Sequence, residues 1–229
     1  MITSGSANFN LDLVESIEEA YERAGVEVRS GYQFKSARRS INLLLMEWAA
    51  KGINLWTVDQ GSIALVVGQV EYDLPPDTVD LLEHVIRQND GSSSLQTDLQ
   101  ITRIALPTYA TIPNKLTTGR PIQLYIDRQA RWPKIKIWPA ANQTGYTLVY
   151  WRLRRIQDAG DVGSYNLDMP FRFLPALIAG LAYYIALKTP GSADRIGMLK
   201  QAYDEAFALA ASEDRDKAAL RLVPRVGYI

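Results

Sequence analysis

The chain contains no cysteine and a single histidine, His84, among its 229 residues. The lack of cysteine excludes disulfides, thiol nucleophiles and zinc–thiolate sites, and it is typical of a protein that folds in a reducing cytoplasm. One histidine has no partner for a histidine-pair metal site, a Ser-His-Asp triad or a Cys-His dyad. If "DLLEHVIRQ" is a strand, His84 shares a face with Leu82 and Ile86, and we expect a hydrogen-bonded histidine of the core or sheet.

The chain also lacks an excess of charge of either sign. Lysine plus arginine and aspartate plus glutamate each number 25, so the formal net charge is zero. A protein held on nucleic acid or on a membrane mainly by its net charge is therefore not expected. The longest apolar run, Phe173 to Leu187, has about 15 residues, fewer than the ~20 that a membrane span needs, and it predicts a buried helix. Because no basic segment followed by an apolar core opens the sequence, we expect a soluble protein without a secretion signal.

Apolar residues recur at helical spacing at both ends of the chain. A good N-cap at Asn10 and a stop at Gly25 predict a first helix, and a second helix is expected over about residues 33–51. A third helix is expected to begin at Pro170 or Pro175 and to end near residue 188, and a fourth covers about residues 193–217.

Between residues 55 and 155 the period of the apolar residues changes to two. The stretches "IALVVGQVEYDLP", "IQLYID", "KIKIW" and "GYTLVYWRLR" predict strands of a small antiparallel meander, joined by turn-rich connections. The sequence therefore predicts an α+β protein. In it, residues 1–54 and 156–217 form a four-helix bundle from the N- and C-terminal helix pairs, and residues 55–155 form an inserted antiparallel β domain.

Two groups of acidic residues leave carboxylate catalysis open. A glycosidase needs two carboxylates at a set separation in a cleft, and sequence spacing does not demonstrate that arrangement. A solvated helix face and a polar loop with an N-cap are the favoured interpretation, and the loop lacks the residue order of a calcium hand. No cofactor or metal is expected. The two groups are Glu15, Glu18, Glu19 and Glu22 on the first helix, and Asp158, Asp161 and Asp168 in "QDAGDVGSYNLDMP".

Basic and aromatic residues form further candidate binding groups. They would suit phosphate contacts and base stacking, but surface ion pairing, sheet packing or a subunit interface is favoured. The cations are Lys35, Arg38 and Arg39 on the second helix and Arg152, Arg154 and Arg155 after the last strand; the aromatics are Trp132, Trp138, Tyr146, Tyr150 and Trp151.

The last stretch, "AALRLVPRVGYI", is too apolar for a disordered tail. Pro224 and Gly227 are helix-breaking residues, so the stretch is not expected to form a continuous helix. We therefore expect an extended C-terminal arm, residues 218–229, that buries its apolar side chains on a partner.

Four stretches, in this order, resemble the head-to-tail adaptor proteins of short-tailed bacteriophages, also called tail accessory factors. The resemblance runs from about residue 10 to residue 225. The stretches are "GYQFKSARRSINLLLMEWAAKGINLWTVDQG", "VEYDLPPDTVDLLEHVIR", "LIAGLAYYIALK" and "SEDRDKAALRLVPR".

This resemblance implies a structural, non-enzymatic protein of the virion neck or tail, present in the host cytoplasm during assembly. Such adaptors form a ring, twelvefold in the members that the chain resembles, beneath the portal protein. The ring extends the channel through which genomic DNA passes without sequence-specific binding, and it carries the tail nozzle or tail-fibre protein; no membrane is involved.

The resemblance also implies roles for particular residues. The arm would dock on the portal through Leu220, Arg221, Leu222, Val223, Pro224, Arg225, Val226, Tyr228 and Ile229. The basic and aromatic groups described above, and not the resemblance, supply the candidate contacts with neighbouring subunits or with the channel. These are Lys35, Arg38, Arg39, Trp132, Trp138, Trp151 and Arg152.

Two other functions remain in competition. A virion-borne peptidoglycan hydrolase would use paired carboxylates, with Glu18 and Asp161 as the residues to substitute. A DNA-binding packaging or completion factor would bind duplex DNA with a steep salt dependence, which the balanced charge does not favour.

Overall fold

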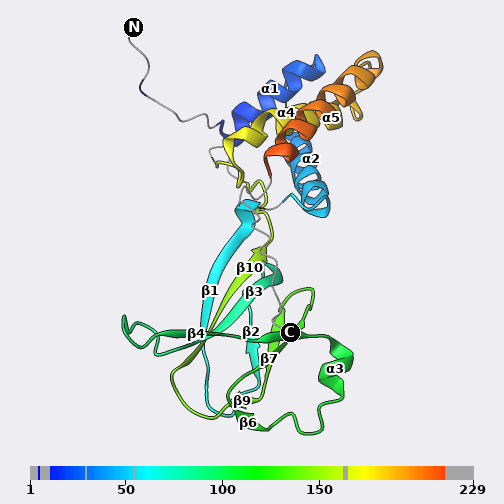
Figure 1. Cartoon of the computed structure of the whole chain (residues 1–229). Coiled ribbons are helices and arrows are strands. Elements are labelled where there is room, and N and C mark those ends of the chain that lie inside the picture. Colours follow the sequence, from blue (N-terminus) through cyan, green and yellow to red (C-terminus); the bar gives the residue numbers. More distant parts are fainter. Residues whose placement is uncertain (1–4, 6–10, 29, 54, 162–164, 215–229) are drawn as a thin grey trace, which may run out of the picture. The chain divides into compact units, whose positions relative to one another are not determined.

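The computed structural model describes residues 5, 11–28, 30–53, 55–161 and 165–214. The chain divides into two compact units (Figure 1). The helical unit comprises Met1–Trp56 and Ile156–Ile229, and the β unit comprises Thr57–Arg155. The mixed α+β architecture predicted from the sequence is confirmed.

Side-chain caps determine where the first two helices begin. α1 spans Leu13–Ala24, and the carboxylate of Asp12 accepts a hydrogen bond from the backbone N of Glu15 at 2.8 Å while the Glu15 carboxylate accepts one from the Asp12 N at 3.1 Å. α2 spans Gly31–Ala50 and begins with the same reciprocal arrangement between Ser30 and Gln33. The predicted N-cap Asn10, which lies outside the described residues, is wrong: Asp12 has the glutamate three residues later that completes a capping box.

The other two long helices follow prolines and a short turn. α4 spans Leu174–Ala186 after the 3₁₀ turn Phe171–Phe173, and Pro175 lies in its first turn. α5 spans Ile196–Glu213 and begins later than expected because Ala193–Arg195 form a 3₁₀ turn. The expected end of this helix, residue 217, lies outside the described residues.

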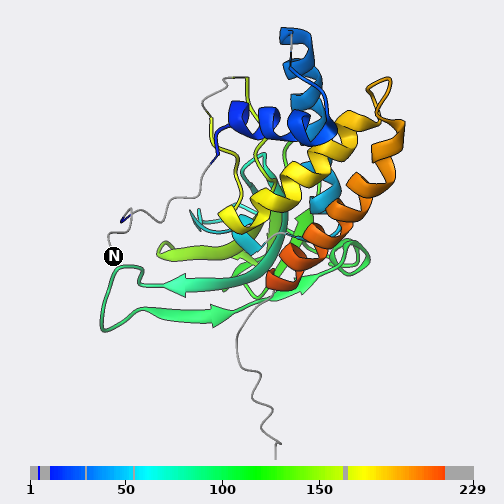
Figure 2. The same ribbon diagram turned by 90° about the horizontal axis from the view of Figure 1, so that it is seen from above.

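α4 is the centre of the helical unit. α1, α2 and α5 each pack against it, and Figure 2 shows α4 between α1 and α5. A Cβ atom at Gly180 of α4 would lie 2.9 Å from side-chain atoms of both Leu44 and Tyr203, so the missing side chain lets α2 and α5 approach closely. α4 is buried along most of its length, as its apolar run predicts. None of the described helices is long and apolar enough to cross a membrane.

The first sheet of the β unit is antiparallel and has the strand order β1-β10-β3-β4. Its central strands, β10 and β3, are also its longest, and they place the buried Leu148 and Ile86 opposite each other. The strands are β1 Val58–Ala64, β3 Thr78–Gln88, β4 Thr97–Gln100 and β10 Tyr146–Arg154.

The second sheet has the order β2-β8-β7-β5. The predicted antiparallel pairing is present between β7 and β8, but a single meander is wrong, because β1 and β10 belong to the first sheet. β5 and β7 run parallel, because the connection through the short helix α3 carries the chain back to the same end of the sheet. β1 and β2 do not pair with each other but belong to different sheets. A small parallel pair, β6 and β9, completes the unit. The elements are β2 Glu71–Asp73, β5 Thr102–Ile104, α3 Leu106–Ala110, β6 Thr118–Gly119, β7 Gln123–Asp127, β8 Lys134–Trp138 and β9 Ala140–Ala141.

Strand alternation builds the core of the β unit. Leu124 and Ile126 of β7 and Ile135 and Ile137 of β8 are buried, while the residues between them are only partly covered. The alternation read from "KIKIW" is therefore confirmed. In "IQLYID" it holds only from residue 123 on, because Ile122, expected on the face of Leu124 and Ile126, precedes β7 and is exposed. Residues of both sheets meet in one apolar cluster.

Candidate functional site

The acidic residues of the hydrolase hypothesis are spread over separate features. Glu15 belongs to the cap of α1, and Glu19 forms an ion pair with Arg23 at 2.7 Å. Glu18 lines a depression at the end of α1 together with Glu22, whereas Asp161 lines a different cleft. The other two acids accept backbone hydrogen bonds, Asp158 from the N of Gly160 and Asp168 from the N of Gln157. Within the described part of the chain, no group of three or more His, Cys, Asp or Glu side chains is placed to hold a metal ion.

His84 is a buried sheet histidine, as predicted, but the expected hydrogen bonds are absent. Neither ring nitrogen has a partner among the described residues, and burial lowers the pKa of the ring. Ile86 is buried with it, but Leu82 is half exposed. The pairing of β3 with β10 shifts register near Leu82, so that residue does not share the buried face.

Arg152 is an ion-pairing residue of the β unit. Its guanidinium pairs with Asp77 and Asp59, and it also donates a hydrogen bond to the hydroxyl of Thr78. The hydrogen bond and charge of Arg152 hold the pKa of Asp77 below its ordinary value. Arg154 also pairs with Asp59, at 3.2 Å. These acids balance the charge that would attract phosphate, so ion pairing, the favoured interpretation, describes Arg152 and Arg154. Arg155 donates a hydrogen bond to the carbonyl of Ala130 at 2.9 Å.

The three candidate tryptophans lie on different elements and do not stack on one another. Trp132 precedes β8 and is 58% exposed, whereas Trp138 ends β8 and donates a hydrogen bond from Nε1 to the carbonyl of Asn114 at 3.0 Å. Trp151 is a half-buried residue of β10 in the other sheet. Tyr146 and Tyr150 belong to the apolar core. Sheet packing accounts for most of this aromatic group.

Lys35 and Arg38 line a cleft between α1 and α2. Its volume is about 290 Å³, and its walls are mostly apolar. Neither cation has an acidic partner within 4 Å among the described residues. Arg39 is exposed and does not line the cleft. Burial lowers the pKa of Lys188, and the positive charge of Arg39 lowers it further. The cleft is lined by Leu13, Val14, Ile17, Gly31, Phe34, Lys35, Arg38 and Asp161.

A hydrogen-bonded network ties α2 to α4 and α5. Trp48 donates from Nε1 to the hydroxyl of Tyr203 at 3.0 Å, and the Glu47 carboxylate accepts from Tyr184 at 2.8 Å and from Tyr203 at 3.2 Å. Burial opposes the ionisation of Glu47, but Lys51 and the tyrosine hydroxyls hold its pKa below the ordinary value. Burial and the neighbouring Glu47 raise the pKa of Tyr184 to about 12. Most partners in this network lie far apart in sequence, so the sequence does not predict the network. The only local signal is the spacing of Glu47 and Lys51, which lie one helical turn apart.

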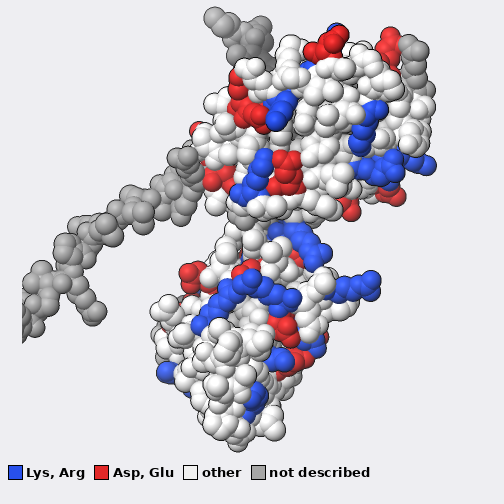
Figure 3. All heavy atoms as spheres, turned by 90° about the vertical axis from the view of Figure 1, so that its right-hand side faces the viewer, with Lys and Arg blue, Asp and Glu red and all other residues white. Residues whose placement is uncertain are grey.

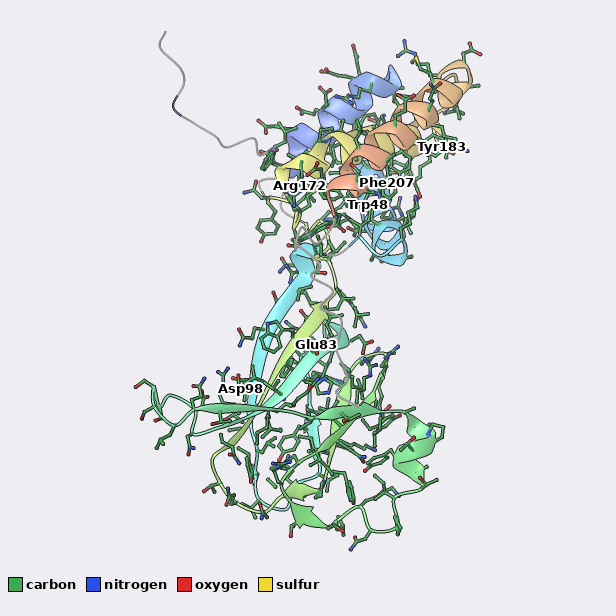
Figure 4. All side chains as sticks on the ribbon, in the orientation of Figure 1. Trp48, Glu83, Asp98, Arg172, Tyr183 and Phe207 are labelled. Carbon is green, nitrogen blue, oxygen red and sulfur yellow. The ribbon has the colours of Figure 1, made fainter. Side chains whose placement is uncertain are left out.

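Aromatic rings surround this network and hold α5 in place. The ring of Trp48 lies 5.9 Å from that of Phe207 and 5.7 Å from that of Phe173. Figure 4 marks Trp48 on α2 and Phe207 on α5. The ammonium of Lys51 lies 4.1 Å from the centre of the Phe207 ring. The helix that leads toward the predicted arm is thus anchored on the helical core.

The predicted portal-binding arm lies outside the described residues, as do all of its named members. These are Leu220, Arg221, Leu222, Val223, Pro224, Arg225, Val226, Tyr228 and Ile229.

Charge is mixed over the visible surface. On the face shown in Figure 3, basic and acidic side chains are interspersed on both units. Duplex DNA binding favours clustered positive charge, so this face offers little support for a DNA-binding factor.

The comparisons with known proteins agree with the sequence resemblance. A family model described as SU10 adaptor protein matches residues 11–225, which include both units of the structure. No curated protein matches the chain.

Proposed function

Because the chain belongs to the SU10 adaptor protein family, we propose that it is a structural head-to-tail adaptor whose copies form a ring beneath the portal. The family membership gives the coarser statement: a component of a phage virion that interacts with other head and tail proteins. The observation that carries the finer proposal is the extent of the match, since residues 11–225 include nearly all of both units.

The proposed ring has about twelve copies, as in the adaptors that the chain resembles, and it extends the DNA channel and carries the tail nozzle or fibre protein. In this proposal residues 1–54 and 156–217 form a four-helix bundle that lies against the portal, and residues 55–155 present surfaces to neighbours or to the tail. DNA passes through without sequence-specific contacts, which is supported by the pairing of Arg152 with Asp59 and Asp77. The protein acts by binding, with no catalytic centre.

The arm of residues 218–229 is proposed to bind the portal. Burial of five or six apolar side chains contributes roughly 1.5–3 kcal/mol each. Ordering about nine residues costs ~1–2 kcal/mol each, so one arm binds weakly. Many arms on one ring bind tightly through avidity, which couples portal binding to ring assembly.

Deletion of Leu220–Ile229 tests the portal contact. We expect a folded protein with unchanged helical circular dichroism that no longer co-sediments with portal rings of the same phage. The full chain is the reference, and the matched control replaces only Arg221 and Arg225 with lysine, which keeps the apolar side chains and the charge. Undiminished co-sedimentation of the truncated chain would overturn the arm proposal.

A further inference from the structure

The cleft between α1 and α2 has the properties of a docking site. Its walls contain Leu13, Ile17 and Phe34, and its two cations, Lys35 and Arg38, outnumber the one acid, Asp161. A volume of about 290 Å³ has room for one or two aliphatic side chains. The occupant that fits is therefore an apolar side chain with an acidic residue beside it.

The outer face of α5 offers this combination on the same chain. Met198 is 63% exposed and Leu209 is 73% exposed, and Glu205 is exposed between them. Residues spaced by seven and four positions on a helix share one face. Glu205 accepts a hydrogen bond from Gln201 at 2.8 Å, but it has no cationic partner among the described residues.

We propose that α5 of one copy docks in the α1–α2 cleft of the next copy, with Leu209 or Met198 entering the cleft and Glu205 facing Lys35 and Arg38. This inference rests on the ring assembly proposed above and identifies the two surfaces that join its subunits. Two large side chains exposed on one helix face, together with opposite charge at the cleft, favour this occupant.

The placement of the helices allows such contacts to repeat. α1 and α5 lie on either side of α4 (Figure 2). The cleft is lined mainly by α1 and α2, whereas Met198 and Leu209 belong to α5, so the two surfaces are different. One copy can therefore contact a neighbour through each surface. A contact between two different surfaces joins each subunit to the next in the same orientation and generates a closed ring or a filament.

The segment after α5 fits the cleft less well. Residues 215–229 contain Arg215, Lys217, Arg221 and Arg225 but only one acid, Asp216. Four cations would face Lys35 and Arg38, so charge favours α5 over this segment.

Charge reversal on the two surfaces gives a test in which two defective proteins repair each other. One variant carries Lys35→Glu and Arg38→Glu, and the other carries Glu205→Lys. Each protein alone places like charges across the contact, and we expect its self-association to weaken by about tenfold or more in sedimentation velocity. An equal mixture restores assembly, because each cleft then meets an α5 of opposite charge. Wild-type association by both variants, or failure of the mixture, would overturn the proposal.

Cross-linking locates the contact directly. The chain has no cysteine, so Lys35→Cys and Glu205→Cys each introduce a single thiol. Treatment of the mixed proteins with a short bis-maleimide, free and bound to portal rings, is expected to give a dimer joining the two positions. The matched control mixes Glu205→Cys with Lys200→Cys instead of Lys35→Cys. Lys200 is an exposed lysine of α5 outside the cleft, so this mixture is expected to give little cross-linked dimer.

The outcomes separate this inference from the adaptor proposal. Protein that binds portal rings without the cross-link between positions 35 and 205 overturns the α5 contact and leaves the adaptor role intact. Protein that gives the cross-link but does not bind portal rings supports the contact and contradicts the adaptor role. Absence of the cross-link from concentrated free protein and from portal mixtures alike overturns the contact.

Discussion

Two groups of cations, one in each unit, differ in how their charge is balanced. In the β unit, Arg152 pairs with Asp59 and Asp77, Arg87 with Asp98, and Lys134 with Glu71. In the helical unit, Lys35 and Arg38 border an apolar cleft without an acidic partner among the described residues. Paired charges stabilise their own fold, whereas charges left beside apolar surface are available to another molecule. This difference favours the contact proposed above for the α1–α2 cleft of the helical unit.

The largest expected effect is on the core that holds α5. Trp48→Ala removes a fully buried ring and the donor to the Tyr203 hydroxyl, and we expect the free energy of unfolding to fall by about 3–5 kcal/mol. Denaturant unfolding followed by circular dichroism measures this loss. Trp132→Ala, at an exposed tryptophan of the β unit, is the control and is expected to cost less than about 1 kcal/mol. Similar losses for the two variants would contradict the assignment of Trp48 as a core anchor.

Arg152 is expected to matter for the stability of the β unit. Arg152→Ala leaves Asp77 and Asp59 without this cation. Because the Arg152 side chain is only 13% exposed, we expect the free energy of unfolding to fall by about 1–3 kcal/mol. Because Asp77 has a lowered native pKa, it contributes stability above its unfolded pKa of about 4, and this contribution is lost as pH falls through the lower native value. The variant should therefore show a weaker loss of stability in acid.

The control for Arg152 is Arg131→Ala, at an exposed arginine with no ion pair among the described residues. It is expected to leave stability and its acid dependence unchanged. An acid profile of Arg152→Ala that matches the wild type would show that Asp77 does not depend on this arginine.

His84 gives the β unit a second pH dependence. Burial lowers its native pKa, so below about pH 6.5 the unfolded chain takes up a proton that the native ring does not. Stability therefore falls as pH drops below this value, by at most about 1.4 kcal/mol per pH unit. Unfolding measured at pH 7.5 and 5.5 should show this fall in the wild type and a smaller one in His84→Leu. If His84→Leu loses as much stability between pH 7.5 and 5.5 as the wild type, His84 is not the source of this pH dependence.

The smallest stability effect is expected at the cleft itself. Lys35→Ala and Arg38→Ala remove cations without acidic partners among the described residues, so the free energy of unfolding should change by less than about 0.5 kcal/mol. A loss above 2 kcal/mol would show that these cations support the fold, and the contrast with Arg152 would disappear.

Local sequence signals were sufficient for the mixed α+β class. The apolar run that forms α4 and the alternation in β7 and β8 depend on residues close in the chain, so the pattern alone predicts them. The start of α1 was predicted wrongly because both Asn10 and Asp12 can act as caps, and the capping box between Asp12 and Glu15 decides between them.

Features that depend on distant pairing were not predictable. The parallel pairing of β5 with β7 depends on the path through α3, and the exposure of Leu82 depends on a register shift against β10. The sequence placed Lys35 and Arg38 on a helix surface, but only the packing of α1 beside α2 shows that they line a cleft. The bond from Trp48 to Tyr203 likewise joins residues that no local pattern connects.

The central claim is tested most directly by negative-stain imaging of portal rings from the same phage, with and without this protein. The adaptor account predicts a new collar of density below the portal, absent from portal alone, with the rotational symmetry of a closed ring. A portal that stays bare at saturating protein would contradict the account.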